Sequence, residues 1–152
     1  IHDLTGITEK LYIKQRDYNE TENRCHSAQK QSGSGHNFIY TLRVDLGGQK
    51  QKLAAYNTSF ITSTTTDHHE DNAATYKFGP QYPATLRKLM YINERKTCFI
   101  LVEDLPENKK GCQLVQTEKT VDQEIPAECS RVYNENCGNK SFVLYEAYCK
   151  RL

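Results

Sequence analysis

The six cysteines, at positions 25, 98, 112, 129, 137 and 149, constrain the fold of this chain more than any other feature. An even number of cysteines without a Cys-x-x-Cys pair is typical of a disulfide framework in an oxidising compartment, rather than of a zinc site or a cytosolic redox motif. Hydrophobic residues make up 37% of the chain and the mean hydropathy is -0.77, so the bridges must support a modest core. Because half of 152 residues rarely makes a self-sufficient core, we expect one disulfide-stapled domain over residues 1–152.

Other features of the sequence agree with secretion. Glycosylation sequons begin at Asn19, Asn57 and Asn139, although such triplets also arise by chance in a chain rich in Asn, Ser and Thr. No apolar run approaches the ~18 residues that a membrane span requires. Ile1 is not a start methionine, so we expect that a signal peptide has been removed. The sequence therefore predicts a soluble, secreted glycoprotein.

The charge pattern argues against binding to nucleic acid. The chain has 20 basic and 19 acidic residues, which gives a formal net charge of +1. Its basic blocks are no longer than pairs such as Lys109-Lys110 and Lys150-Arg151. A nucleic-acid-binding surface requires a clustered basic face, so we exclude that class of function.

Alternation of apolar and polar residues dominates the sequence and predicts a β-protein. In residues 36–44, for example, Phe38, Tyr40, Leu42 and Val44 share one face of an extended chain. Pro126 at the start and Gly138 beyond the end favour one helix over residues 126–136. About eight strands and a late helix are typical of an up-and-down barrel. The expected strands cover residues 11–18, 36–44, 53–64, 74–78, 86–92, 97–102 and 112–116, with a last extended run at 141–148.

The C-terminal third of the chain resembles the tick salivary histamine-binding lipocalins. The similarity lies in Cys98-Phe99-Ile100-Leu101-Val102, Cys112-Gln113-Leu114-Val115, Ile125-Pro126-Ala127-Glu128-Cys129 and Tyr145-Glu146-Ala147-Tyr148-Cys149. Upstream, residues 11–18 followed by Cys25 are similar to that family's first strand and first cysteine, and residues 74–76 to its strand with a pocket tyrosine. The resemblance implies an all-β, eight-stranded antiparallel lipocalin barrel with a C-terminal helix.

The resemblance also implies a pairing of the cysteines, which spacing alone leaves open among 15 possibilities. The expected bridges are Cys25–Cys149 and Cys98–Cys129, and the two cysteines left over are expected to form a third bridge, Cys112–Cys137.

A barrel of this size holds one small ligand. A buried amine requires carboxylates and aromatic faces. This chain has Phe99 where the amine-binding relatives place an acid, and Gln113-Leu114-Val115 where they have Glu-Leu-Trp. It contains no tryptophan, but it has 10 tyrosines and 5 phenylalanines. We therefore expect it to bind a fatty acid, eicosanoid or sterol and so to modulate host inflammation or immunity. The alternatives are a scavenger of histamine or serotonin and an immunomodulator that binds a host protein or cell.

Alternation and the family resemblance together select the candidate ligand-binding residues. They are Tyr12, Tyr40, Leu42, Tyr76, Phe78, Leu89, Tyr91, Phe99, Leu101, Gln113 and Val115. Arg43 or Arg87 could pair with a carboxylate on the ligand, because a guanidinium binds a carboxylate through two hydrogen bonds. For each arginine, a solvated side chain on a strand is the more common state.

Metal and enzyme functions receive less support from the sequence. The Asp67-His68-His69-Glu70-Asp71 segment contains metal-binding residue types, but adjacent histidines on an extended chain point to opposite sides, so we expect a polar hairpin loop. The cysteines are committed to bridges and the sequence contains no Gly-x-Ser-x-Gly or His-Glu-x-x-His motif. We expect no metal, no cofactor and no enzyme activity.

Overall fold

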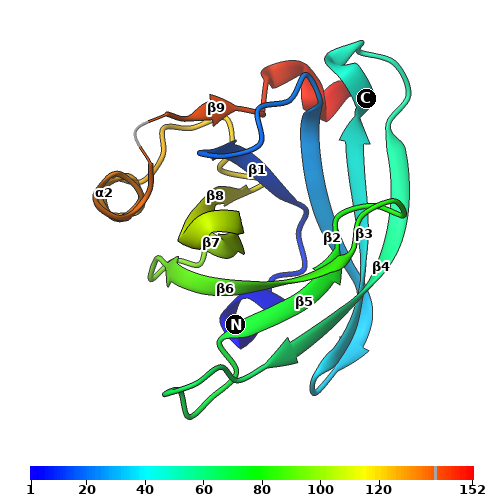
Figure 1. Ribbon diagram of the computed structural model, residues 1–152. Coiled ribbons are helices and arrows are strands. Elements are labelled where there is room, and N and C mark those ends of the chain that lie inside the picture. Colours follow the sequence, from blue (N-terminus) through cyan, green and yellow to red (C-terminus); the bar gives the residue numbers. More distant parts are fainter. Residues whose placement is uncertain (139) are drawn as a thin grey trace.

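The computed structural model describes residues 1–138 and 140–152, and its central feature is a closed antiparallel barrel (Figure 1). Hydrogen-bonded neighbours follow the order β2-β3-β4-β5-β6-β7-β8-β1, and an additional β1–β2 pairing closes the barrel. The predicted eight-stranded barrel is thus confirmed. The barrel strands are β1 Leu11–Arg16, β2 Arg24–Ser34, β3 Asn37–Asp45, β4 Ala54–Ser63, β5 Ala73–Lys77, β6 Ala84–Ile92, β7 Cys98–Leu105 and β8 Lys109–Thr117.

The alternation in the sequence is visible as alternating burial along the strands. In β3, Phe38 and Tyr40 are 6% and 2% exposed, whereas Ile39 between them is 38% exposed. Phe38 lies opposite Phe60 of β4, so aromatic side chains from neighbouring strands meet inside the barrel. This inward packing fixes the register, because a slip of one residue would turn every inward side chain outward.

The prediction was wrong about which segment supplies the eighth strand. Strand β2 was not predicted, because its sequence, Arg24–Ser34, is mostly polar and lacks the expected apolar alternation. It forms because it pairs with β3 along most of its length and with β1 at the seam of the barrel. The extended run expected at 141–148 contributes only the two-residue β9, Phe142–Val143, beside β1, and the chain then forms a 3-10 helix, Ala147–Arg151.

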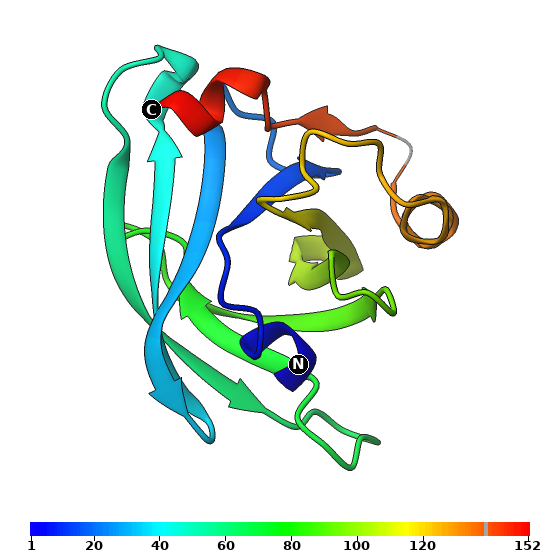
Figure 2. The ribbon, with the colours of Figure 1, turned by 180° about the vertical axis from the view of Figure 1, so that it is seen from behind.

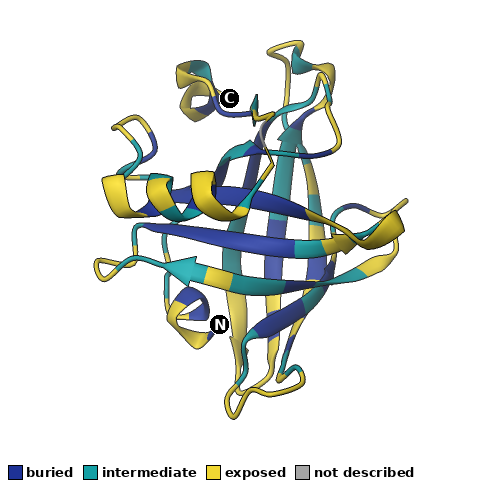
Figure 3. Ribbon diagram, turned by 60° about the vertical axis from the view of Figure 1, so that its left-hand side comes forward, coloured by how far each residue is buried: buried dark blue, intermediate teal, exposed yellow. Residues whose placement is uncertain are grey.

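Helix α2, Ala127–Asn136, confirms the helix predicted for residues 126–136, and it lies on the outside of the barrel (Figure 3). Its buried residues, Cys129 and Tyr133, belong to a cluster with residues of β7 and β8. Figure 3 shows this arrangement: the outer side of the helix is exposed and the strands behind it are buried. The short helix α1, His2–Thr5, was not predicted and lies at one end of the barrel near β5 (Figure 2). Among the described residues, no helix is long and apolar enough to cross a membrane.

Disulfides connect the barrel wall to the segments outside it. The bridges are Cys25–Cys149 between β2 and the C-terminal 3-10 helix, Cys98–Cys129 between β7 and α2, and Cys112–Cys137 between β8 and the end of α2. This is the pairing that the family resemblance implied. Two bridges thus fix α2 against the barrel, and the third closes a loop that spans most of the chain.

Candidate ligand-binding site

The barrel encloses a cavity of about 650 Å³. This volume lies within the range of small-molecule sites, roughly 300–1,000 Å³. In an up-and-down barrel alternate connections lie at the same end, and the cavity is lined by the β1–β2, β3–β4 and β5–β6 connections, which therefore surround its mouth. Leu4 of α1 lines the cavity from the opposite end and is 2% exposed, so α1 forms the floor.

The deep part of the cavity is apolar and aromatic. The rings of Tyr40 and Phe60 lie 4.5 Å apart between centroids, and those of Phe60 and Tyr76 lie 5.0 Å apart. Leu11 and Phe99 belong to the same buried cluster. Side chains of this kind fit hydrocarbon, because each buried apolar group of a ligand gains roughly 25 cal/mol per Å² removed from water.

Closer to the mouth, the wall carries connected polar side chains that we name the polar band. The hydroxyl of Tyr18 donates to Glu103 Oε1, and Gln113 Nε2 donates to the Tyr18 hydroxyl over 2.6 Å. Arg87 Nε lies 3.5 Å from Glu103 Oε1, and both side chains are almost fully buried. Burial and the neighbouring Glu103 carboxylate raise the pKa of Tyr18, which therefore remains a neutral donor. The polar band consists of Arg16, Tyr18, His26, Arg87, Glu103 and Gln113.

Two guanidinium groups and one carboxylate give the polar band an excess positive charge. The Arg87 guanidinium lies 4.4 Å from the centre of the Tyr76 ring and 5.2 Å from that of Phe78. Burial opposes its charged form, but Tyr76 and Glu103 outweigh burial and the pKa of Arg87 is raised. Arg16 Nη2 donates to the backbone oxygen of Asn19 over 2.6 Å. Both arginines are charged at any physiological pH, so the site is suited to an anion.

Several polar atoms of the cavity wall lack a hydrogen-bond partner. Among the described residues that line the cavity, the buried side-chain atoms without a hydrogen bond are Arg16 Nε, His26 Nδ1, Tyr40 Oη and Arg87 Nε, of which Arg87 Nε is ion-paired with Glu103. Buried polar groups are nearly always hydrogen-bonded in folded proteins, because an unmet donor loses about 1–3 kcal/mol of solvation. The cavity wall therefore contains polar groups whose hydrogen bonds the protein itself does not supply.

The cavity contains most of the candidates from the sequence and excludes three of them. Tyr12 faces outward and packs edge-on against Tyr145, with ring centroids 5.1 Å apart. Tyr91 packs against the cluster beneath α2, because a register shift between Leu89 and Tyr91 changes the alternation of β6. Leu89 packs against the main core without lining the cavity. The candidates that line it are Tyr40, Leu42, Tyr76, Phe78, Phe99, Leu101, Gln113 and Val115.

Sequence reasoning missed many cavity residues, including Arg16, Tyr18, His26, Phe60 and Glu103. Glu103 could have been found by continuing the alternation of Phe99 and Leu101 by one more step along β7. His26 had no such signal, because β2 itself was not recognised. The chain thus has a buried carboxylate in its cavity although it lacks one directly after Cys98.

The two arginines considered from the sequence differ in their surroundings. Arg87 is 5% exposed and belongs to the polar band. Arg43 is half-buried, lines the cavity and donates from Nη1 to Gln29 Oε1 over 3.1 Å, so it already has a partner. Among the sequons, Asn19 and Asn57 are exposed, as glycosylation requires, and Asn139 lies outside the described residues.

His26 predicts a pH dependence of stability. Burial, together with the charges of Arg16 and Arg24, lowers its pKa from 6.5 to about 3. Between these values the unfolded chain binds a proton that the folded chain does not, so the free energy of unfolding should fall as the pH falls, by about 1 kcal/mol per pH unit. We expect urea unfolding of the His26→Gln variant to show a shallower decline between pH 6.5 and 4.5. Parallel profiles for the two proteins would contradict this assignment.

The comparisons with known proteins agree with the geometry. The family model "Tick histamine binding protein" matches residues 3–151. Japanin from Rhipicephalus appendiculatus bound to cholesterol has a similar structure, with a TM-score of 0.66 at 16% identity over 91% of this chain and 93% of that one. The AM182 serotonin complex has a TM-score of 0.67 at 9% identity, over 93% of this chain and 85% of that one. A search of curated protein sequences finds no match.

These two structural similarities concern the fold alone, because both identities are low. The family match covers nearly the whole chain and includes every strand of the barrel and all six cysteines. The chain therefore belongs to the tick histamine-binding protein family and is a tick salivary lipocalin, a protein that binds ligands and is not an enzyme.

Proposed function

We propose that this protein is secreted in tick saliva and sequesters an amphipathic host lipid with an acidic headgroup, such as a fatty acid or an eicosanoid. The hydrocarbon of the ligand occupies the deep aromatic part of the cavity around Phe60 and Phe99, and its headgroup lies in the polar band. Removal of such a mediator from the bite site would reduce host inflammation or immunity.

The observation that carries this proposal is the pair of guanidinium groups of the polar band, Arg16 and Arg87, which line the cavity and have a single carboxylate of that band, Glu103, to balance them. A guanidinium carries its charge permanently, and Glu103 balances only one of the two, so an anionic oxygen of the ligand would balance the other. The neutral ring of His26 offers a further hydrogen bond to this headgroup, and the Tyr40 hydroxyl, deeper in the cavity, suits a polar group farther along the ligand. A neutral sterol would fit the deep aromatic part of the cavity equally well but would leave the excess positive charge of the polar band unbalanced.

Glu103 favours a second candidate function, the capture of a biogenic amine. Its carboxylate is buried among aromatic rings, a combination that suits a cationic ligand. The carboxylate already accepts a hydrogen bond from Tyr18 and lies beside Arg87. An amine would have to displace the guanidinium, so we rank amines below acidic lipids.

Native mass spectrometry of protein from a eukaryotic host, followed by solvent extraction, tests the ligand class. A fatty acid or eicosanoid at about one molecule per chain would support the proposal. Calorimetric binding of serotonin or histamine, with no uptake of lipids, would support the amine function instead. Failure with both classes would direct the search to host proteins.

Point variants test the role assigned to the polar band. We expect Arg16→Met to weaken the binding of arachidonic acid at least tenfold, because a charge-assisted hydrogen bond contributes roughly 1.5–3 kcal/mol. Fluorescence displacement of a bound probe measures this loss. The variant should bind arachidonyl alcohol, which has no charge, as the unmodified protein does.

Arg95→Met is a matched control. Arg95 is exposed in the β6–β7 connection, so this substitution removes the same charge at a position away from the cavity. Equal losses in the two variants would show that net charge, rather than the polar band, determines affinity. Tyr40→Phe provides a milder test, since it deletes an unpartnered hydroxyl and retains the ring.

A further inference from the structure

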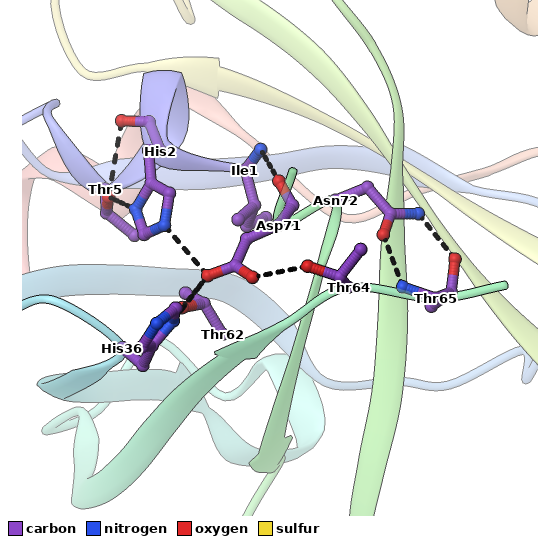
Figure 4. A network of polar contacts seen from close by, with 9 residues as sticks. All are labelled: Ile1, His2, Thr5, His36, Thr62, Thr64, Thr65, Asp71 and Asn72. Atoms are coloured by element: carbon purple, nitrogen blue, oxygen red, sulfur yellow. Dashed lines mark hydrogen bonds and ion pairs between the residues drawn. The ribbon is translucent and has the colours of Figure 1, made fainter. Parts of the chain in front are cut away.

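The geometry points to a zinc-binding site at the floor end of the barrel, formed by His2, His36 and Asp71. We name these residues the floor-end cluster. His2 lies in α1, His36 in the β2–β3 connection, and Asp71 just before β5, so only the fold brings them together (Figure 4). His2 Nε2 lies 3.0 Å and His36 Nδ1 2.6 Å from Asp71 Oδ2.

The arrangement is close to what zinc requires. Zinc bonds to histidine nitrogen and carboxylate oxygen are roughly 2.0–2.2 Å long, which places neighbouring ligands of a tetrahedral site roughly 3.3 Å apart. The ligand atoms of the floor-end cluster all lie within 4.8 Å of one another. The side chains of His2 and His36 are 48% and 66% exposed, so both can rotate by the small amount that admits an ion.

Asp71 is held in place and kept ionised by neighbouring hydroxyl groups. Thr64 donates to its Oδ1 and Thr62 to its Oδ2, each over 2.8 Å. These hydrogen bonds, with further ones from the two histidines, lower the pKa of the Asp71 carboxyl. His2 is oriented as well, since its Nδ1 contacts Thr5 Oγ1 over 3.2 Å and leaves Nε2 facing Asp71. Supporting contacts of this kind are typical of histidine and carboxylate ligands in metal sites.

The surroundings of the cluster supply further ligands. The same surface depression is lined by His69 and Glu70, either of which could complete the coordination with water. Asp3, also in the depression, is engaged by Lys96 over 3.3 Å. Of the Asp67-His68-His69-Glu70-Asp71 segment considered in the sequence analysis, only Asp71 belongs to the floor-end cluster, and the two histidines of the cluster come from distant segments. Nitrogen and carboxylate ligands together favour zinc over calcium or magnesium.

Zinc at this position would connect α1 to the barrel. Leu4 of α1 lines the cavity floor, so an ion bound through His2 would hold the floor closed. A ligand that binds only the folded chain raises its melting temperature. At free zinc a hundred times the dissociation constant, we expect a rise of roughly 5–10 °C.

The experiment uses protein without a histidine tag, stripped of metal with EDTA and titrated with zinc chloride in a calorimeter. We expect one zinc ion per chain, and a loss of affinity of at least tenfold in His36→Ala and in Asp71→Asn. His68→Ala is the matched control, because it removes an exposed histidine outside the cluster and should bind as the unmodified protein does. Cobalt in place of zinc should give the visible absorption of a tetrahedral site.

Near-UV circular dichroism shows whether each variant is folded, and His36→Ala remains informative if Asp71→Asn is not, since His36 is exposed. Absence of stoichiometric zinc binding would overturn the assignment. Equal losses of zinc affinity in His36→Ala and His68→Ala would also overturn it, because they would indicate that zinc binds to scattered surface histidines.

Discussion

Replacing both Cys25 and Cys149 by serine should lower the free energy of unfolding by about 5 kcal/mol. These cysteines are 124 residues apart, so the bridge closes nearly the whole chain into one loop and restricts the unfolded state strongly. The bridge also ties the start of β2, the polar strand at the seam of the barrel, to the C-terminal segment. Urea unfolding followed by near-UV circular dichroism measures the loss, which would leave little of the stability of a typical domain.

The other bridges provide the comparison. The Cys98–Cys129 and Cys112–Cys137 separations are 31 and 25 residues, so the same chain-entropy argument gives a smaller loss of about 3.5 kcal/mol for each. We therefore expect the Cys25→Ser/Cys149→Ser protein to be the least stable of three double variants. An equal or smaller loss than in the other two would show that loop closure does not determine the order.

Arg87→Met should lower the free energy of unfolding by about 3 kcal/mol. Arg87 and Glu103 form a nearly buried pair, with side chains 6% and 12% exposed, and the variant leaves the Glu103 carboxylate without its counter-charge. Removing one member of a buried pair costs more than removing both, because the remaining charge has lost both water and its partner.

The double variant Arg87→Met/Glu103→Leu distinguishes this explanation from a loss of packing. We expect it to be more stable than Arg87→Met alone, since no uncompensated charge remains in the cavity wall. Urea unfolding of the two single variants and the double variant forms a mutant cycle that measures the interaction between the side chains. A double variant whose loss equals the sum of the single losses would show that the two groups do not interact.

The sequence by itself determined the barrel, the late helix and the cysteine framework, and the physical reasons are local. Strands such as β3 alternate with a period of two, so burial of one face is encoded residue by residue. Pro126 marks the start of α2, and the segments around Cys98, Cys112 and Cys129 carry the family resemblance. For the same reason, most residues predicted to face the interior, such as Tyr40 and Phe99, line the cavity.

Only the tertiary structure decided how the barrel closes and what its cavity offers a ligand. Strand β2 is too polar to be recognised alone and is specified by its pairing with β1 and β3. The polar band joins Arg16, His26, Arg87 and Glu103, which lie on four different strands and meet only when the seam closes. The charge excess on which the proposed preference for an acidic ligand rests therefore depends on the register of the strands, which no local pattern in the sequence encodes.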